Sequence, residues 1–174
     1  MILFDRFKQV KAFIFAVDGV CADGKVWVSA HGEPWSAFHH RDRYALHSAA
    51  QHYPVALVGN GYAPGSAQCL QGLNLADLLL ATGDKKAVLG DWMSDRGVEA
   101  ENVLCMGGDV TDLDALMVAG FGTCPADAAD DVKAMAAYIS PFSGGSGAVR
   151  DVIEKVMKLQ GTWGVGGGSQ LSAL

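Results

Sequence analysis

Short apolar runs alternate with longer stretches of mixed apolar and polar residues along most of the chain. The first run, residues 12–17, is rich in β-branched and aromatic side chains. A run of this length and composition is typical of a strand that is buried on both faces of a parallel sheet. The same pattern predicts further strands at residues 55–58, 77–80, 103–106 and 121–124, and a short extended segment at residues 137–140.

The stretches between these runs carry the end signals of helices. Pro64 in the first turn of one stretch, Asp84 before another and Gly97 after it are residues that favour helix ends. Strands that alternate with helices form βαβ units, so we predict an α/β fold with a doubly wound parallel sheet. The expected helices span residues 41–52, 64–73, 84–96, 112–119, 126–136 and 147–159.

An insertion interrupts this alternation after the first strand. Residues 25–29 and 35–39 have alternating character around a turn that contains Gly32. This pattern predicts a β-hairpin at about residues 25–40. Trp27 and Trp35 could pair across the hairpin and supply apolar area for an interface.

The length of 174 residues and the lack of a linker-like segment predict a single domain over residues 1–163. Half of the residues are hydrophobic, so the chain can bury a sizeable core. Residues 164–174 are rich in glycine and serine and show no apolar periodicity. We expect a flexible tail there.

Charge and composition exclude several classes of partner. The net charge is −6 and no basic run exists, which argues against a nucleic-acid partner. No apolar run approaches the roughly 18 residues of a membrane span, and residues 1–10 lack the apolar segment of a signal peptide. We therefore expect a cytoplasmic protein without a membrane partner. The cysteines have no C-x-x-C spacing, which favours buried free thiols: Cys21, Cys69, Cys105 and Cys124.

Candidate chemistry lies at the ends of the predicted strands. Asp18, Gly59 and Gly108 come just after the first, second and fourth strands. The carboxyl ends of parallel strands meet at one edge of the sheet, and open α/β sheets bind ligands there. Taken alone, Asp18 could belong to a simple turn, and Asp109 and Asp112 could only cap the start of a helix.

Several sequence blocks at consistent spacing resemble the haloacid-dehalogenase (HAD) phosphatases, and in particular the 3-deoxy-D-manno-octulosonate (KDO) 8-phosphate phosphatases. The block V-D-G-V-C-A-D-G at residues 17–24 matches the first motif of the family after its first aspartate, and V-L-C-M-G-G-D-V-T-D-L at residues 103–113 matches its fourth motif. The resemblance covers roughly residues 7–163. It implies a Rossmann-like HAD fold without a large cap domain, Mg²⁺ as a cofactor and a homotetramer. Further matching blocks lie at residues 38–46, 54–61, 83–89, 124–128 and 143–152.

The resemblance also implies roles for single residues. In these phosphatases an aspartate at the end of the first strand attacks phosphorus, and a second aspartate two residues later acts as general acid and base. Carboxylates and a backbone carbonyl hold the Mg²⁺ that screens the phosphate. Asp18 stands at the acid–base position, and its carbonyl belongs to the implied metal site. The other implied residues are Lys85, Gly59 and Asn60 for phosphate, Gly108, Asp109 and Asp112 for the metal, and Arg41 and Arg150 for the substrate.

Three of the implied positions hold residues that cannot carry out this chemistry. Ala16 stands at the nucleophile position, Gly59 replaces a phosphate-binding threonine or serine, and Gly108 replaces a metal-binding aspartate. Alanine has no atom that attacks phosphorus, and Mg²⁺ is normally held by carboxylates. We therefore expect a catalytically impaired pseudo-phosphatase with weak or absent Mg²⁺ binding. Such a protein would act by binding a partner, or a sugar-phosphate or sugar-acid ligand.

A working Mg²⁺-dependent sugar-phosphate phosphatase is the alternative interpretation, because Asp18, Lys85, Asp109 and Asp112 are retained. Asp18 or a water molecule would then take the place of the missing nucleophile. Release of phosphate from KDO 8-phosphate distinguishes the two interpretations.

Overall fold

The structure, a computed structural model, describes residues 2–59, 77–80 and 84–164. Asn60, the predicted helix at residues 64–73 and nearly all of the predicted tail lie outside these residues. That residues 1–163 form a single domain therefore stays a prediction.

Within the described part of the chain, six strands form one parallel sheet. In chain order they are β1 (Ala12–Ala16), β4 (Val55–Gly59), β5 (Asp77–Leu80), β6 (Val103–Met106), β7 (Phe121–Cys124) and β8 (Tyr138–Ile139). The spatial order is β5-β4-β1-β6-β7-β8, with Phe13 of β1 paired with both Val55 and Leu104. Every residue of β1 is buried, which explains its continuous apolar run. The predicted α/β fold with a parallel sheet is confirmed.

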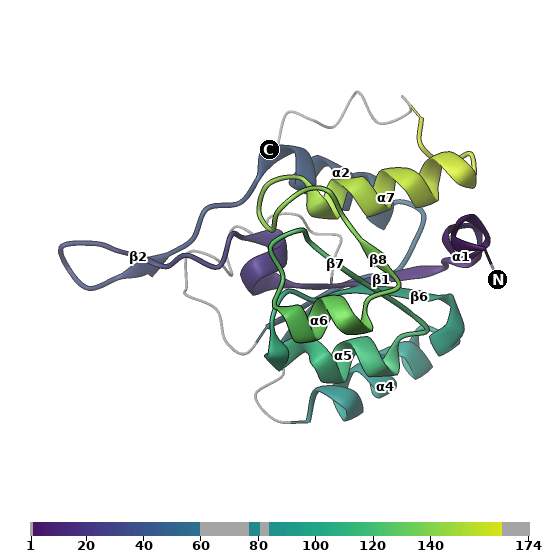
Figure 1. The fold of residues 1–174 in the computed structure, drawn as a ribbon, viewed down its shortest axis with the longest axis horizontal. Coiled ribbons are helices and arrows are strands. Elements are labelled where there is room, and N and C mark those ends of the chain that lie inside the picture. Colours follow the sequence, from purple (N-terminus) through teal and green to yellow (C-terminus); the bar gives the residue numbers. More distant parts are fainter. Residues whose placement is uncertain (1, 60–76, 81–83, 165–174) are drawn as a thin grey trace.

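Helices cover both faces of the sheet, as Figure 1 shows. One group consists of α1 (Leu3–Gln9), α2 (His40–Ala50) and α7 (Ala148–Leu159), and the other of α4 (Lys85–Asp95), α5 (Leu113–Val118) and α6 (Asp130–Met135). Alternate residues of β1 supply the two cores. Phe13 and Phe15 belong to the core under α2 and α7, whereas Ala12 and Ile14 belong to the core on the opposite face. Single turns of 3-10 helix at Ala100–Asn102 and Val110–Asp112 precede β6 and α5.

A two-stranded antiparallel hairpin projects from the body of the molecule (Figure 1). Its strands are β2 (Trp27–Val28) and β3 (Pro34–Trp35). The rings of Trp27 and Trp35 stack across it with their centroids 5.9 Å apart. These side chains are 54% and 51% exposed, so the apolar surface of the hairpin is not covered by the described part of the chain. The predicted hairpin and its tryptophan pair are confirmed.

The predicted second strand of the hairpin, residues 35–39, is too long. Beyond Trp35 the chain makes an isolated bridge between Phe38 and Ala22, and α2 begins at His40. The carbonyl of His39 accepts the first helical bond, from the Arg43 N–H at 3.1 Å. The alternation of apolar and polar residues therefore extends beyond the end of β3, into the segment that leads to α2.

The helix predicted at residues 126–136 is also too long, because α6 begins only at Asp130. The Ala126 N–H donates to the Phe142 carbonyl at 2.9 Å, and the Ala129 N–H donates to the Gly108 carbonyl at 3.0 Å. These residues are therefore tied to neighbouring loops instead of forming a helical turn. Similarly, the helix predicted at residues 112–119 is Leu113–Val118, preceded by a separate 3-10 turn.

The cysteine prediction holds within the described residues, where Cys21, Cys105 and Cys124 are buried free thiols. Burial raises the pKa of the Cys21 and Cys105 thiols far above the ordinary range. Among the helices of these residues, none is long and apolar enough to cross a lipid bilayer.

Candidate functional site

A cavity of about 420 Å³ lies at the carboxyl ends of β1, β4 and β6, where open α/β sheets bind ligands. The structure brings most of the predicted site residues to its wall from separate segments of the chain. Asp23 and Asp127, which the sequence analysis did not single out, lie there too, although both belong to blocks that carried the family resemblance. The predicted residues in the wall are Ala16, Asp18, Gly59, Lys85, Gly108, Asp109 and Asp112.

The end of β1 places Ala16 and Asp18 beside the cavity. Ala16 is buried and contributes only a methyl group to the wall. The turn after Asp18 requires Gly19, whose φ of 75° lies in the left-handed region. Partial burial raises the pKa of the Asp18 carboxyl, the nearby Asp112 raises it further, and Lys85 opposes both. Asp18 therefore holds its proton more tightly than an ordinary surface aspartate does.

The start of α4 buries Lys85, which is only 5% exposed. Its Nζ donates to the Thr111 carbonyl at 2.7 Å and to Asp112 Oδ1 at 3.1 Å. Its neighbour Lys86, by contrast, is exposed. The positive charge of Lys85 is therefore already paired with a carboxylate in the cavity wall.

The carboxylates after β6 hold the backbone of their own loop. Asp112 Oδ2 accepts the N–H of Gly108 at 2.9 Å and the N–H of Asp109 at 3.2 Å. Asp109 Oδ1 accepts the N–H of Val110 at 2.7 Å, which completes a reciprocal cap at the start of the 3-10 turn. The capping role that the sequence left open for Asp109 and Asp112 is thus present in the structure.

The two glycine positions lack the side-chain oxygens that the resemblance implies. Gly59 ends β4 as a buried residue without a hydroxyl group. A β-carbon on Gly108 would lie 2.9 Å from the Gly19 carbonyl oxygen and 3.4 Å from Val20 Cγ2. The backbone after β1 thus occupies the space in which a side chain at position 108 would begin.

Few side-chain oxygens at the positions of the implied Mg²⁺ site are free of other contacts. Mg²⁺ demands near-octahedral oxygen coordination and usually binds one or two carboxylates in proteins. In the described ranges, no group of three or more histidine, cysteine, aspartate or glutamate side chains is arranged to hold a metal ion. Both oxygens of Asp112 already accept hydrogen bonds, and Ala16 and Gly108 offer no side-chain ligand.

The glycine-rich segment before α7 packs against the loop after β1 and against Asp127. The Gly145 N–H donates to the Val20 carbonyl at 2.8 Å, and the Gly144 N–H donates to Asp127 Oδ1 at 2.8 Å. A β-carbon on Gly144 would lie 1.9 Å from the Gly19 carbonyl oxygen. Only a glycine at position 144 lets this segment approach the loop after β1 so closely.

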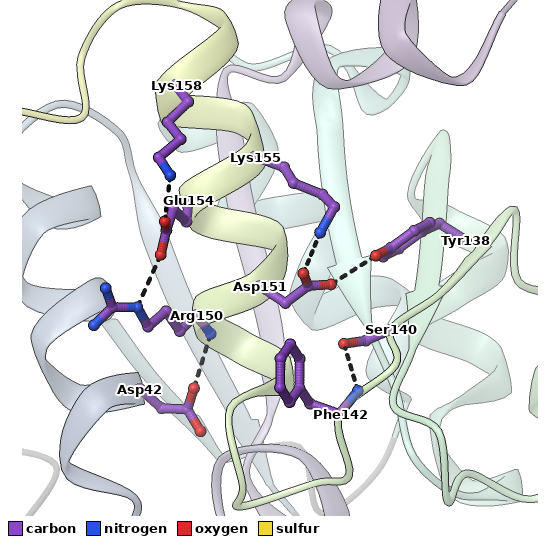
Figure 2. Close-up of polar contacts among 9 residues, drawn as sticks. All are labelled: Asp42, Tyr138, Ser140, Phe142, Arg150, Asp151, Glu154, Lys155 and Lys158. Carbon is purple, nitrogen blue, oxygen red and sulfur yellow. Dashed lines mark hydrogen bonds and ion pairs between the residues drawn. The ribbon is translucent and has the colours of Figure 1, made fainter.

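Arg41 and Arg150 lie apart from the other implied site residues, and their role in binding substrate stays a prediction. Neither arginine lines the cavity at the strand ends, and both lie in a separate groove beside α7. The physical reason is the way in which α7 is anchored. Asp42 of α2 is buried and accepts the backbone N–H groups of Gly147 at 3.0 Å and of Arg150 at 2.8 Å. This cap, drawn in part in Figure 2, leaves the Arg150 side chain on the outer side of the helix.

Comparisons with known proteins agree with the resemblance found in the sequence, although no protein-family model matches the chain. The chain is 28% identical over 155 residues to the 3-deoxy-D-manno-octulosonate 8-phosphate phosphatase KdsC of Salmonella typhi, with 88% of this chain and 82% of the relative covered. It is 29% identical over 157 residues to KdsC of Haemophilus influenzae, with 90% and 87% covered.

Solved structures give the same result. The 3-deoxy-D-manno-octulosonate 8-phosphate phosphatase of Moraxella catarrhalis, in complex with magnesium, phosphate and KDO, matches with a TM-score of 0.84 and 27% identity, covering 91% of each chain. The cobalt-bound enzyme of Haemophilus influenzae matches with a TM-score of 0.84 and 29% identity, covering 90% of this chain and 92% of the other. The chain is therefore a homologue of the KDO 8-phosphate phosphatases of the HAD superfamily.

Proposed function

We propose that this protein is a pseudo-phosphatase, a homologue of the KDO 8-phosphate phosphatases that binds a ligand or a partner without hydrolysing a phosphate ester. The observation that carries the proposal is Ala16, which lines the cavity at the end of β1 where the family has its nucleophile. A methyl group cannot form the covalent phosphoryl intermediate. Loss of a nucleophile typically costs on the order of 10⁴–10⁶ in rate.

Weak or absent Mg²⁺ binding is part of this proposal. The relative from Moraxella catarrhalis contains a magnesium ion. In this chain the carboxylates of Asp109 and Asp112 accept backbone N–H groups, and Asp112 also pairs with Lys85. A cation would have to compete with these donors, and the side chains at positions 16 and 108 would contribute nothing to it.

The ligand proposed for the strand-end cavity is a sugar phosphate or a sugar acid. The same relative holds KDO and phosphate. A cavity of about 420 Å³ falls within the usual size of small-molecule sites. In this proposal Lys85 and the backbone around Gly59 face the phosphate-binding part of the cavity, and Asp18 faces the rest of the ligand.

The test is a ³¹P NMR experiment in which KDO 8-phosphate is incubated with the protein and MgCl₂. We expect the ester resonance to shift or broaden on binding and to keep its full intensity over hours. An Ala16→Gly variant, which changes the volume of the cavity but not its chemistry, is the matched control and should also leave the ester intact. Growth of an inorganic phosphate resonance with the wild-type protein would refute the proposal.

A functioning Mg²⁺-dependent phosphatase is the second candidate, and one observation favours it. Asp18 and Lys85 both line the cavity, and the raised pKa of Asp18 suits a group that donates a proton to a leaving alcohol. Water or Asp18 itself would then have to attack phosphorus. The same ³¹P experiment separates this candidate from the first.

We also propose a cytoplasmic homotetramer that is built in part through the hairpin. A two-stranded ribbon is marginally stable alone, and its open edges need cover. Val26, Trp27, Val28 and Trp35 are all more than half exposed, which gives the hairpin an apolar surface suited to contact with other copies.

A further inference from the structure

A second cavity, of about 470 Å³, lies on the outer side of α7, and we refer to it as the α7 groove. It is bounded by the start of α2, the segment at residues 142–147 and the exposed face of α7. Figure 2 shows most of its charged side chains along the helix. The α7 groove shares no lining residue with the cavity at the strand ends. Its lining residues are His39, Arg41, Phe142, Ser146, Gly147, Arg150, Asp151, Glu154, Lys155 and Lys158.

The α7 groove is basic although the chain as a whole is acidic. Four of the thirteen lysines and arginines line it, in a protein whose net charge is −6. Glu154 is shared by two cations, since it lies 2.9 Å from Arg150 Nε and 2.6 Å from Lys158 Nζ. Lys155 is paired with Asp151. The two cations beside Glu154 therefore exceed it by one positive charge, part of which the buried Asp42 offsets near Arg150.

Arg41 adds a second positive charge that is not balanced, because no ion pair or hydrogen bond involves this residue among the described residues.

The pKa of Glu154 reflects the same balance of charge. Hydrogen bonding to Lys158 lowers the pKa of the Glu154 carboxyl, partial burial opposes the change, and Arg150 lowers it further. Lys158 and Arg150 thus stabilise a negative charge at this point of the groove.

Arg150 is held in one orientation by its neighbours. Its guanidinium carbon lies 6.0 Å from the ring centroid of Tyr44 and 5.4 Å from that of Trp163, both within the range of cation–π contact. Its Nε donates to Glu154, whereas its two terminal nitrogens have no partner within the described residues. A planar, fixed guanidinium with free terminal N–H groups is suited to bidentate contact with a carboxylate or phosphate.

The start of α7 cannot itself hold an anion, because Asp42 already accepts the N–H groups of Gly147 and Arg150. Recognition must therefore come from side chains. Phe142 lines the groove beside the first turn of α7 and is 49% exposed, which offers an apolar surface next to the cations.

We propose that the α7 groove binds a small organic anion, with its carboxylate or phosphate group on Arg41 and Arg150 and its carbon skeleton against Phe142. This site is independent of the strand-end cavity, so the inference does not rest on the proposed function. It also accounts for the position of the two arginines outside that cavity.

The experiment is a ¹H–¹⁵N NMR titration of the full chain at low ionic strength with two probes, KDO as a carboxylate and inorganic phosphate. We expect saturable shifts at the backbone amides of Arg41, Ser146 and Arg150. The probe that binds more tightly identifies the anion class, and either order agrees with the proposal. Because Arg41→Gln removes a charge-assisted hydrogen bond to the anion, it should weaken binding by about tenfold or more. Because Arg41 is exposed, this variant should fold normally.

Lys86→Gln is the matched control, since Lys86 is an exposed cation on α4, which belongs to the helices on the other face of the sheet. It should leave the affinity of both probes unchanged. An equal loss of affinity in Arg41→Gln and Lys86→Gln would reveal a nonspecific charge effect and would overturn the proposal. So would a lack of saturation, or shifts confined to amides at the strand ends such as Gly19 and Gly108.

Discussion

The carbonyl oxygen of Gly19 lies 2.9 Å from the position that a β-carbon on Gly108 would occupy. The loop after β1 thus lies against position 108, where the resemblance implies a metal-binding aspartate. An aspartate at position 108 would have to displace this loop before it could reach a metal ion. At position 108 the backbone packing, and not only the missing carboxylate, therefore works against a side-chain metal ligand.

This contact predicts that Gly108→Ala destabilises the protein. Steric overlap with a backbone carbonyl cannot be relieved by a side-chain rotation, so we expect the free energy of unfolding to fall by about 1–3 kcal/mol. Gly90→Ala is the matched control, because nothing lies within 4 Å of its β-carbon position inside α4. That variant should gain about 0.5–1 kcal/mol from helix propensity. Urea denaturation measures both, and a Gly108→Ala protein as stable as the wild type would contradict the packing described here.

Two adjacent lysines should differ sharply in their effect on stability. Lys85 and Asp112 are both buried and paired at 3.1 Å, so Lys85→Met leaves a buried carboxylate without its counter-charge. We expect a loss of about 3–5 kcal/mol in the free energy of unfolding. Lys86 pairs with Asp114 at the surface, and Lys86→Met should change stability by about 1 kcal/mol or less. Similar values for the two variants would show that the Lys85 pair is not buried in solution.

Much of the sheet could be predicted from the sequence, because each strand is a short apolar run and every residue of β1 is buried. The strand-end position of Asp18 and Gly108 followed from the same reasoning. The start of α6 could not be predicted, since the composition of residues 126–129 favours a helix. The N–H groups of Ala126 and Ala129 bond instead to carbonyls of distant loops.

The placement of the Arg150 side chain could not be predicted from the sequence for a similar reason. Its side chain lies outside the strand-end cavity because Asp42, more than a hundred residues earlier in the chain, caps α7. No local signal marks such a pair. In the same way, the position of Lys85 at a helix start gave no indication of its contact with Asp112 across the site.

The buried cap at Asp42 predicts a characteristic pH dependence. Burial raises the pKa of the Asp42 carboxyl above its ordinary 3.8, although the N–H groups of Arg150 and Gly147 and the nearby His39 oppose this. A group with a higher pKa in the folded state binds more protons when the protein is folded. The contribution of Asp42 to the free energy of unfolding therefore increases as the pH falls through its folded pKa toward 3.8. At neutral pH the ionised carboxylate therefore stabilises the fold less than its protonated form does at low pH.

We expect the stability of the wild type relative to Asp42→Asn to increase as the pH is lowered through this window. Comparison of the two proteins cancels the contributions of other titrating groups. Urea denaturation of both proteins between neutral and mildly acidic pH gives the difference directly. A difference that stays constant, or that shrinks toward acid pH, would contradict the raised pKa.

The exposed hairpin predicts that self-association depends on its tryptophans. We expect light scattering to give a mass near four times that of one chain. Trp27→Lys combined with Trp35→Lys should produce a smaller species, because the substitutions remove the apolar surface and add charge to it. Met117→Lys, at an exposed apolar residue of α5, should leave the mass unchanged. A wild-type monomer at micromolar concentration would rule out the tetramer.

The steady-state turnover of KDO 8-phosphate in the presence of Mg²⁺ tests the central claim most directly. With Ala16 at the end of β1, and with the carboxylates of Asp109 and Asp112 already accepting backbone N–H groups, we expect no phosphate release above the protein-free background. Adding EDTA should therefore make no difference to the signal. A Mg²⁺-dependent turnover of about 1 s⁻¹ or faster, the low end of ordinary enzymes, would contradict the account.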